Sequence, residues 1–132
     1  MAITAQDLIN SSAKQAGILA EGQSLEAGVN ADALKRLNRM IARFQNDGVE
    51  LGLSTLIASD TMYIDDSDEE ALEIQFTLRL MVRHRRPVDQ CLSGAGKSAL
   101  TELQAKYSKI STLTIDPAIT VKRFKNFDIN AG

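Results

Sequence analysis

Hydrophobic residues recur at intervals of three and four along much of the chain, which is the spacing of one face of an amphipathic helix. The clearest stretch is 30–46, where basic residues stand between the apolar positions and Asp47-Gly48 ends the pattern. Its apolar stripe is Leu34, Leu37, Ile41 and Phe44. We therefore predict a helix over 30–46 with Leu37 and Phe44 in the hydrophobic core.

A second helix signal lies near the start of the sequence. Thr4 and Asp7 have the spacing of a capping box, in which two side chains and two backbone amides bond reciprocally at a helix start. The apolar positions that follow predict a helix over about 4–16, ended by Gly17. Residues 20–29 are polar and rich in glycine, so we expect a loop there.

The middle of the chain carries weaker signals. Apolar positions alternate loosely over 49–66, and this alternation favours a short β-hairpin. Ser67 and Glu70 have the spacing of a second capping box, which predicts a helix from there towards Pro87. A further apolar stripe predicts a fourth helix over about 88–109.

The last part of the sequence, 111–132, holds large apolar side chains without a helical period. We therefore expect a helical domain over 1–110 and an extended C-terminal docking arm over 111–132. The fold class predicted is mainly α, a bundle of about four helices with a short β-hairpin and this arm. The arm residues expected to bind a partner are Lys122, Arg123, Phe124, Lys125, Phe127 and Ile129.

Composition agrees with one helical domain. The 132 residues are 44% hydrophobic but only 5% aromatic with no Trp, which favours helices over a β-sandwich. The single Cys91 excludes an intramolecular disulfide. No segment has the pattern of a signal peptide or the roughly 18 consecutive apolar residues of a membrane span, so we expect synthesis in a reducing cytoplasm and no membrane partner.

Charge is distributed unevenly along a chain whose net charge is only −2. Residues 51–78 carry seven acids and no base, whereas 79–110 carry seven bases and two acids. The two blocks are either solvated faces or matching faces of neighbouring subunits, and both interpretations stay open. The candidate subunit-interface charges are Arg79, Arg83, Arg85, Arg86, Asp65, Asp66 and Asp68.

Signs of catalysis are weak. Residues 94–98, Gly-Ala-Gly-Lys-Ser, look like the end of a phosphate-binding P-loop, but Cys91 occupies the position that needs the first glycine and no buried strand precedes it. We interpret 94–98 as a loosely wound helix turn. His84 stands among three arginines, which disfavour its use as a base, and no pair of carboxylates is singled out by spacing. We therefore expect no catalytic residue, no metal site, no cofactor and no enzyme activity.

Several of these runs together resemble a known family. They are Thr4-Ala5-Gln6-Asp7-Leu8-Ile9 leading to Ala16-Gly17-Ile18, a glycine-rich spacer, Ala33-Leu34-Lys35-Arg36-Leu37-Asn38-Arg39-Met40, and Phe44-Gln45-Asn46-Asp47-Gly48-Val49. The last run is similar to the family's aromatic-x-x-Asp-Gly-aliphatic sequence, and a weaker match covers Arg83 to Pro87. In this order the runs resemble the head-to-tail adaptor proteins of short-tailed bacteriophages, also called head completion or packaged-DNA stabilisation proteins.

The resemblance implies a structural virion protein at the head-tail interface. Such a protein assembles as a ring of about twelve copies on the portal protein, extends the DNA channel and helps retain packaged DNA without sequence specificity. It also provides a platform for the tail nozzle or tail tube protein. Two alternatives remain from the residues alone. The first is a small helical nucleic-acid-binding regulatory protein, favoured by the basic patches, and the second, more remote, is a hydrolase of cell-wall glycan.

Overall fold

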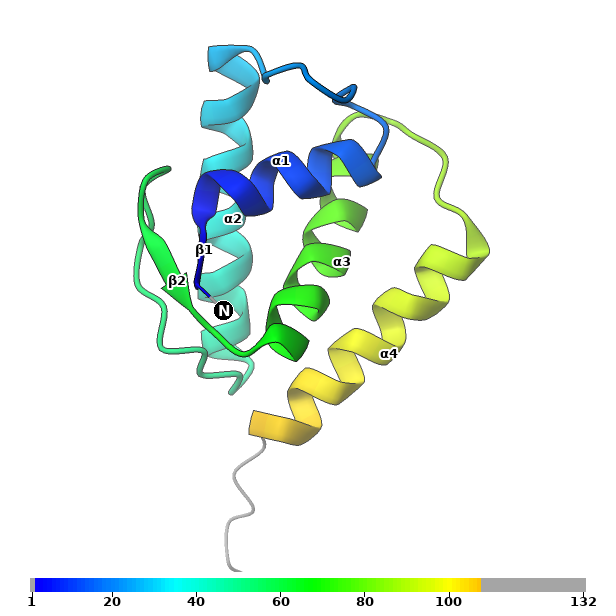
Figure 1. The fold of residues 1–132 in the computed structure, drawn as a ribbon. Helices are drawn as coiled ribbons and strands as arrows, with labels where there is room; N and C mark the ends of the chain where they lie inside the picture. The colour runs from blue at the N-terminus through cyan, green and yellow to red at the C-terminus, as the bar shows by residue number, and fades with distance from the viewer. Residues whose placement is uncertain (1, 108–132) are drawn as a thin grey trace, which may run out of the picture.

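The computed structural model describes residues 2–107, which form four helices and one small antiparallel sheet (Figure 1). The helices are α1 (Ala5–Gln15), α2 (Ala27–Asn46), α3 (Asp66–Arg83) and α4 (Gln90–Tyr107), and the strands are β1 (Ala2–Thr4) and β2 (Thr61–Tyr63). The mainly helical fold predicted from the sequence is therefore confirmed. The proposed docking arm, 111–132, lies outside the described residues.

The core lies where α1, α2 and α3 meet. α1 runs across α2 and α3, and α4 packs along α3 (Figure 1). Leu37 and Phe44, the two residues of α2 expected inside, are 0% and 2% exposed, which confirms the assignment of the helical face. Phe76 of α3 is fully buried in the same cluster, and α4 adds Leu103. The core is thus built mainly from aliphatic side chains with two phenylalanines.

The predicted β-hairpin within 49–66 is wrong, because β2 pairs with β1 from the start of the chain. The register is Ala2 with Tyr63, Ile3 with Met62 and Thr4 with Thr61. Pairing there places the side chain of Met62 in the core with no exposed surface. The sheet consequently closes the first sixty residues into a loop.

The segment before β2 needs no partner strand, because side chains of α2 satisfy its backbone. The Asn38 amide donates to the Leu56 carbonyl at 2.9 Å and accepts from the Leu56 N–H at 2.8 Å. The Gln45 amide donates to the carbonyl of Leu53. Leu51, Leu53 and Leu56 are all buried, so the alternation that suggested strands reflects an irregular segment anchored on a helix.

Helix starts follow the sequence signals in one case and not in the other. The capping box of Thr4 and Asp7 is present at the start of α1, as predicted. The second capping box, Ser67 with Glu70, is not formed, because α3 begins at Asp66 with Asp65 at its cap position. The Asp65 side chain makes no cap hydrogen bond and instead binds a lysine of α4.

Three helices end in the same backbone arrangement. The second residue after each helix takes a left-handed conformation, with φ of 74° at Gly17, 89° at Gly48 and 54° at Arg85. The next amide then donates back across the helix end, from Ile18 to Ala13, from Val49 to Phe44 and from Arg86 to Met81. Glycine takes this conformation without strain, whereas Arg85 does not.

The P-loop-like run 94–98 lies within α4, which confirms that it is part of a helix. Gly96 is buried, and a Cβ added there would lie 2.3 Å from Cδ1 of Leu78. The Gly96 carbonyl also accepts a hydrogen bond from the Gln75 amide at 2.5 Å. The glycine therefore permits a close approach between α4 and α3, which is a packing role.

Candidate functional site: an arginine groove

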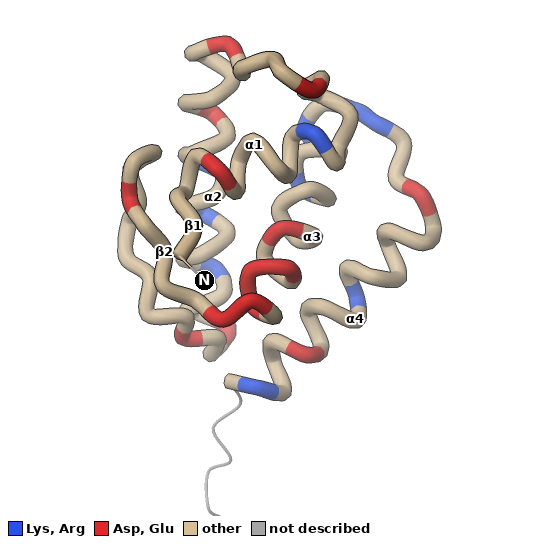
Figure 2. Tube along the Cα trace, viewed as in Figure 1, with Lys and Arg blue, Asp and Glu red and all other residues tan. Residues whose placement is uncertain are grey.

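A groove between α2 and α3 is lined mostly by cationic side chains. Its volume is about 630 Å³ and it opens to solvent. Its lining residues are Arg36, Arg39 and Arg43 of α2, Gln75, Leu78, Arg79, Val82 and Arg83 of α3, and Arg85 just beyond α3. Figure 2 shows the basic positions spaced along α2 beside α3.

Helical spacing gathers these side chains on facing surfaces. Arg36, Arg39 and Arg43 are three and four residues apart, so they share one face of α2. Arg79 and Arg83 are four apart and share one face of α3. Because the two helices pack against each other, the two rows of guanidinium groups line one groove.

One described carboxylate lies among these cations. Asp32 accepts from Nε of Arg36 at 3.0 Å and lies 3.5 Å from Nε of Arg83. The hydrogen bond from Arg36 is the main cause that lowers the pKa of Asp32, and Arg83 adds to it. Across residues 2–107, no other carboxylate forms a salt bridge with the groove arginines. Six guanidinium groups against one carboxylate leave the groove with five uncompensated positive charges.

The like charges affect each other. Burial lowers the pKa of Arg79, and the positive charge of Arg43 lowers it further. Both effects disfavour the charged form of Arg79, so the groove carries an electrostatic cost that a bound anion would offset. The groove also has an apolar part, formed by Leu78 and by Val82, whose surface is 71% exposed.

The candidate interface charges lie in the groove, beside it, and at the start of α3. Arg79, Arg83 and Arg85 line the groove, whereas Arg86 is exposed outside it. Asp66 is exposed at the start of α3. The groove residues of α2, Arg36, Arg39 and Arg43, were not among the predicted site residues, although their spacing of three and four could have indicated a shared basic face.

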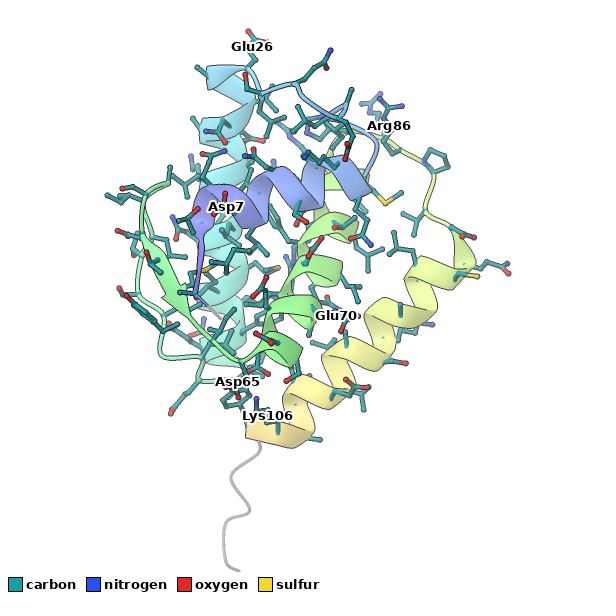
Figure 3. The ribbon with its side chains drawn as sticks, in the orientation of Figure 1. Asp7, Glu26, Asp65, Glu70, Arg86 and Lys106 are labelled. Atoms are coloured by element: carbon teal, nitrogen blue, oxygen red, sulfur yellow. The ribbon has the colours of Figure 1, made fainter. Side chains whose placement is uncertain are left out.

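Asp65 and Asp68 bind within the chain. Nζ of Lys106 lies 2.7 Å from an Asp65 oxygen and 3.0 Å from both Asp68 oxygens, and the Tyr107 hydroxyl donates to Asp68 at 2.5 Å. Figure 3 shows Asp65 and Lys106 facing each other where α3 begins and α4 ends. Asp68 is 2% exposed, so it joins two helices and does not contribute to a surface charge.

These contacts also change ionisation. The hydrogen bond from Lys106 lowers the pKa of Asp65, and hydrogen bonds to Asp65 and Asp68 raise the pKa of Lys106. The hydrogen bond to Asp68 raises the pKa of Tyr107. The cluster therefore fixes the charged forms of the lysine and of Asp65 at neutral pH.

Residues 2–107 offer little other site chemistry. Within this range, no group of three or more His, Cys, Asp or Glu side chains is arranged to hold a metal ion. No helix there is long and apolar enough to cross a membrane. Cys91 is exposed and has no disulfide partner in the same part of the chain. The arm residues Lys122, Arg123, Phe124, Lys125, Phe127 and Ile129 lie outside the described residues.

A comparison with models of known protein families gives no match, and a comparison with curated proteins gives none either. The described residues, 2–107, define the class as a mainly helical protein with a strongly basic surface groove.

Proposed function

We propose that the protein is a structural, non-enzymatic virion protein, a head-to-tail adaptor. In this role it assembles as a ring on the portal protein, extends the DNA channel, helps retain packaged DNA and provides the attachment platform for the tail nozzle or tail tube protein. It is synthesised in the host cytoplasm and resides at the head-tail interface of the virion.

The observation that carries the proposal is the arginine groove. Five uncompensated positive charges on one open surface of an acidic chain favour stable contact with a large anionic partner. An adaptor ring surrounds the channel through which DNA leaves the filled head. Each subunit of the ring therefore lies next to DNA and next to two neighbouring subunits, which are anionic partners of this kind. The resemblance of 4–49 to adaptor proteins supports the same role.

The direct test is assembly on a portal. The full chain is mixed with the portal protein encoded in the same genome, and the products are examined by negative-stain electron microscopy and native mass spectrometry. We expect a ring of about twelve copies on the portal, closed by head-to-tail contacts. A full chain that stays monomeric beside intact portal contradicts the adaptor role.

A truncated chain ending at Ser111 is the matched variant. It keeps all four described helices, so we expect it to fold as a helical monomer with the circular dichroism spectrum of a helical protein. It lacks Phe124 and Phe127, the proposed apolar anchors, and we expect it not to join the portal. Normal assembly of the truncated chain would show that the arm does not dock.

The groove also favours a second function, a nucleic-acid-binding regulatory protein. The two functions differ in specificity, because a regulator prefers one DNA sequence whereas an adaptor binds all sequences alike. Competition between a selected oligonucleotide and random DNA separates them. A preference of more than about tenfold, together with no portal binding, would favour the regulator.

A further inference from the structure

We propose that the arginine groove binds the phosphodiester backbone of nucleic acid without reading its sequence. The inference deepens the proposed function, on which it rests for the source of the nucleic acid, namely packaged DNA. The surface concerned is formed by α2 and by the end of α3, and it is complete in a single copy of the chain.

The kind of cation in the groove points to an oxyanion that accepts paired hydrogen bonds, which is a phosphate or a carboxylate. Six of the seven arginines between 2 and 107 line it, and none of the lysines in that range does. Guanidinium is planar and binds phosphate or carboxylate through two parallel hydrogen bonds, whereas ammonium acts as a point charge. A groove that only needed positive charge would be expected to contain both kinds of residue.

The length of the groove favours a chain of phosphates over a single one. Arg36 and Arg43 are seven residues apart, which is about 10 Å along a helix. Phosphates of one DNA strand recur about every 3.4 Å along the axis, so a groove of this length that lies along the axis spans about three of them. Leu78 and Val82 add an apolar surface against which sugar rings can pack.

The acidic start of α3 on a neighbouring copy is a competing occupant, and the contacts of its carboxylates disfavour it. Asp65 and Asp68 are engaged by Lys106 of their own chain. Glu73 accepts a hydrogen bond from Ser11 at 2.5 Å. The acidic start of α3 therefore has too few uncommitted carboxylates to neutralise five positive charges.

The test compares two variants of the full chain with equal reductions in positive charge. Both leave Arg36 and Arg83 in place, since these bind Asp32. The groove variant carries Arg39→Gln, Arg43→Gln and Arg79→Gln. The control carries Lys14→Gln, Lys35→Gln and Lys97→Gln, three exposed cations outside the groove. Circular dichroism and thermal unfolding first establish that both variants fold.

Binding is measured by fluorescence anisotropy with a labelled DNA duplex of arbitrary sequence, between about 50 and 200 mM NaCl. For the wild type, we expect the logarithm of affinity to fall linearly with the logarithm of salt concentration. The groove variant should bind at least about tenfold more weakly, and its salt slope should be smaller by about 1 for each phosphate that it no longer neutralises. The control should change affinity by less than about threefold.

Four results would overturn the proposal. A wild-type protein that does not bind the duplex at low salt refutes the proposal. If the affinity for the duplex falls equally in the two variants, binding depends on overall charge and not on the groove. If inorganic polyphosphate displaces the labelled duplex as well as unlabelled DNA does at the same phosphate concentration, the groove is a site for free phosphate chains. If the wild type self-associates without binding DNA, and only the groove variant loses this self-association, the groove is a contact with a neighbouring copy. All four are measured without portal, so they are independent of ring assembly.

Discussion

The two glycines in the first half of α4 allow a paired test of how this helix packs. Gly94→Ala and Gly96→Ala are the same chemical change in the same helix, two residues apart. A Cβ at position 94 meets no atom within 4 Å, whereas a Cβ at position 96 lies 2.3 Å from Cδ1 of Leu78. The difference in stability between the two variants therefore measures one contact between α4 and α3.

The magnitudes follow from this geometry. Replacing glycine by alanine inside a helix stabilises it by about 1 kcal/mol, and Gly94→Ala should show this gain in full. At Gly96 the new carbon lies more than about 1 Å inside the normal separation of carbon atoms, so Leu78 must rotate or α4 must shift. Overpacking of this kind costs about 1 to 3 kcal/mol. We expect Gly96→Ala to be less stable than Gly94→Ala by that amount.

Urea unfolding followed by circular dichroism gives the free energy of unfolding of each variant. Leu78→Ala supplies the control, because it removes the atom that the new Cβ would strike. In that background Gly96→Ala should stabilise the protein about as much as Gly94→Ala does. If Gly96→Ala stabilises the wild-type chain equally well, α4 does not approach α3 in the way the structure describes.

Three further predictions concern single residues. Ser12→Ala should raise the free energy of unfolding by about 1 kcal/mol, because the buried Ser12 hydroxyl has no hydrogen-bond partner among the described residues. Ser11→Ala should lower the free energy of unfolding, because it removes the hydrogen bond to Glu73 of α3, and urea unfolding that ranks the two variants in the opposite order would contradict both expectations. Arg85→Gly should raise the melting temperature by relieving about 1 kcal/mol of left-handed strain, and a lower value would show that the arginine side chain stabilises the fold. Asp68→Asn should lower the pKa of Tyr107, since the carboxylate that raises it is removed; a phenolate absorbance titration that stays unchanged would refute the contact.

Local signals predicted the helices well. The apolar stripe of α2 and the capping box of Thr4 depend on neighbours within a few turns, and both are present in the structure. The hairpin failed because the partner of β2 is β1, almost sixty residues away, and no local pattern encodes such a pairing. The Ser67 capping box failed because Asp65, engaged by Lys106 of α4, occupies the helix start.

The candidate site was predictable in part. The basic residues at the end of α3 stand out in the sequence as a charge cluster, and Arg79, Arg83 and Arg85 do line the groove. The contribution of α2 was missed, because only the packing of α2 on α3 brings the two arginine faces together. The acids around Asp68 resemble surface charge in the sequence, which does not reveal that Lys106 binds them across a helix pair.

The small sheet also determines when α1 can be completed during folding. The amides of Ala5 and Gln6 in its first turn donate to the carbonyls of Asp60 and Ala58, each at 3.0 Å. These acceptors are synthesised more than fifty residues later, so α1 leaves the ribosome before its own N-terminal acceptors exist. Its docking must then wait for a long loop to close. Hydrogen exchange at Ala5 and Gln6 will consequently report the opening of the whole domain, not the fraying of one helix end.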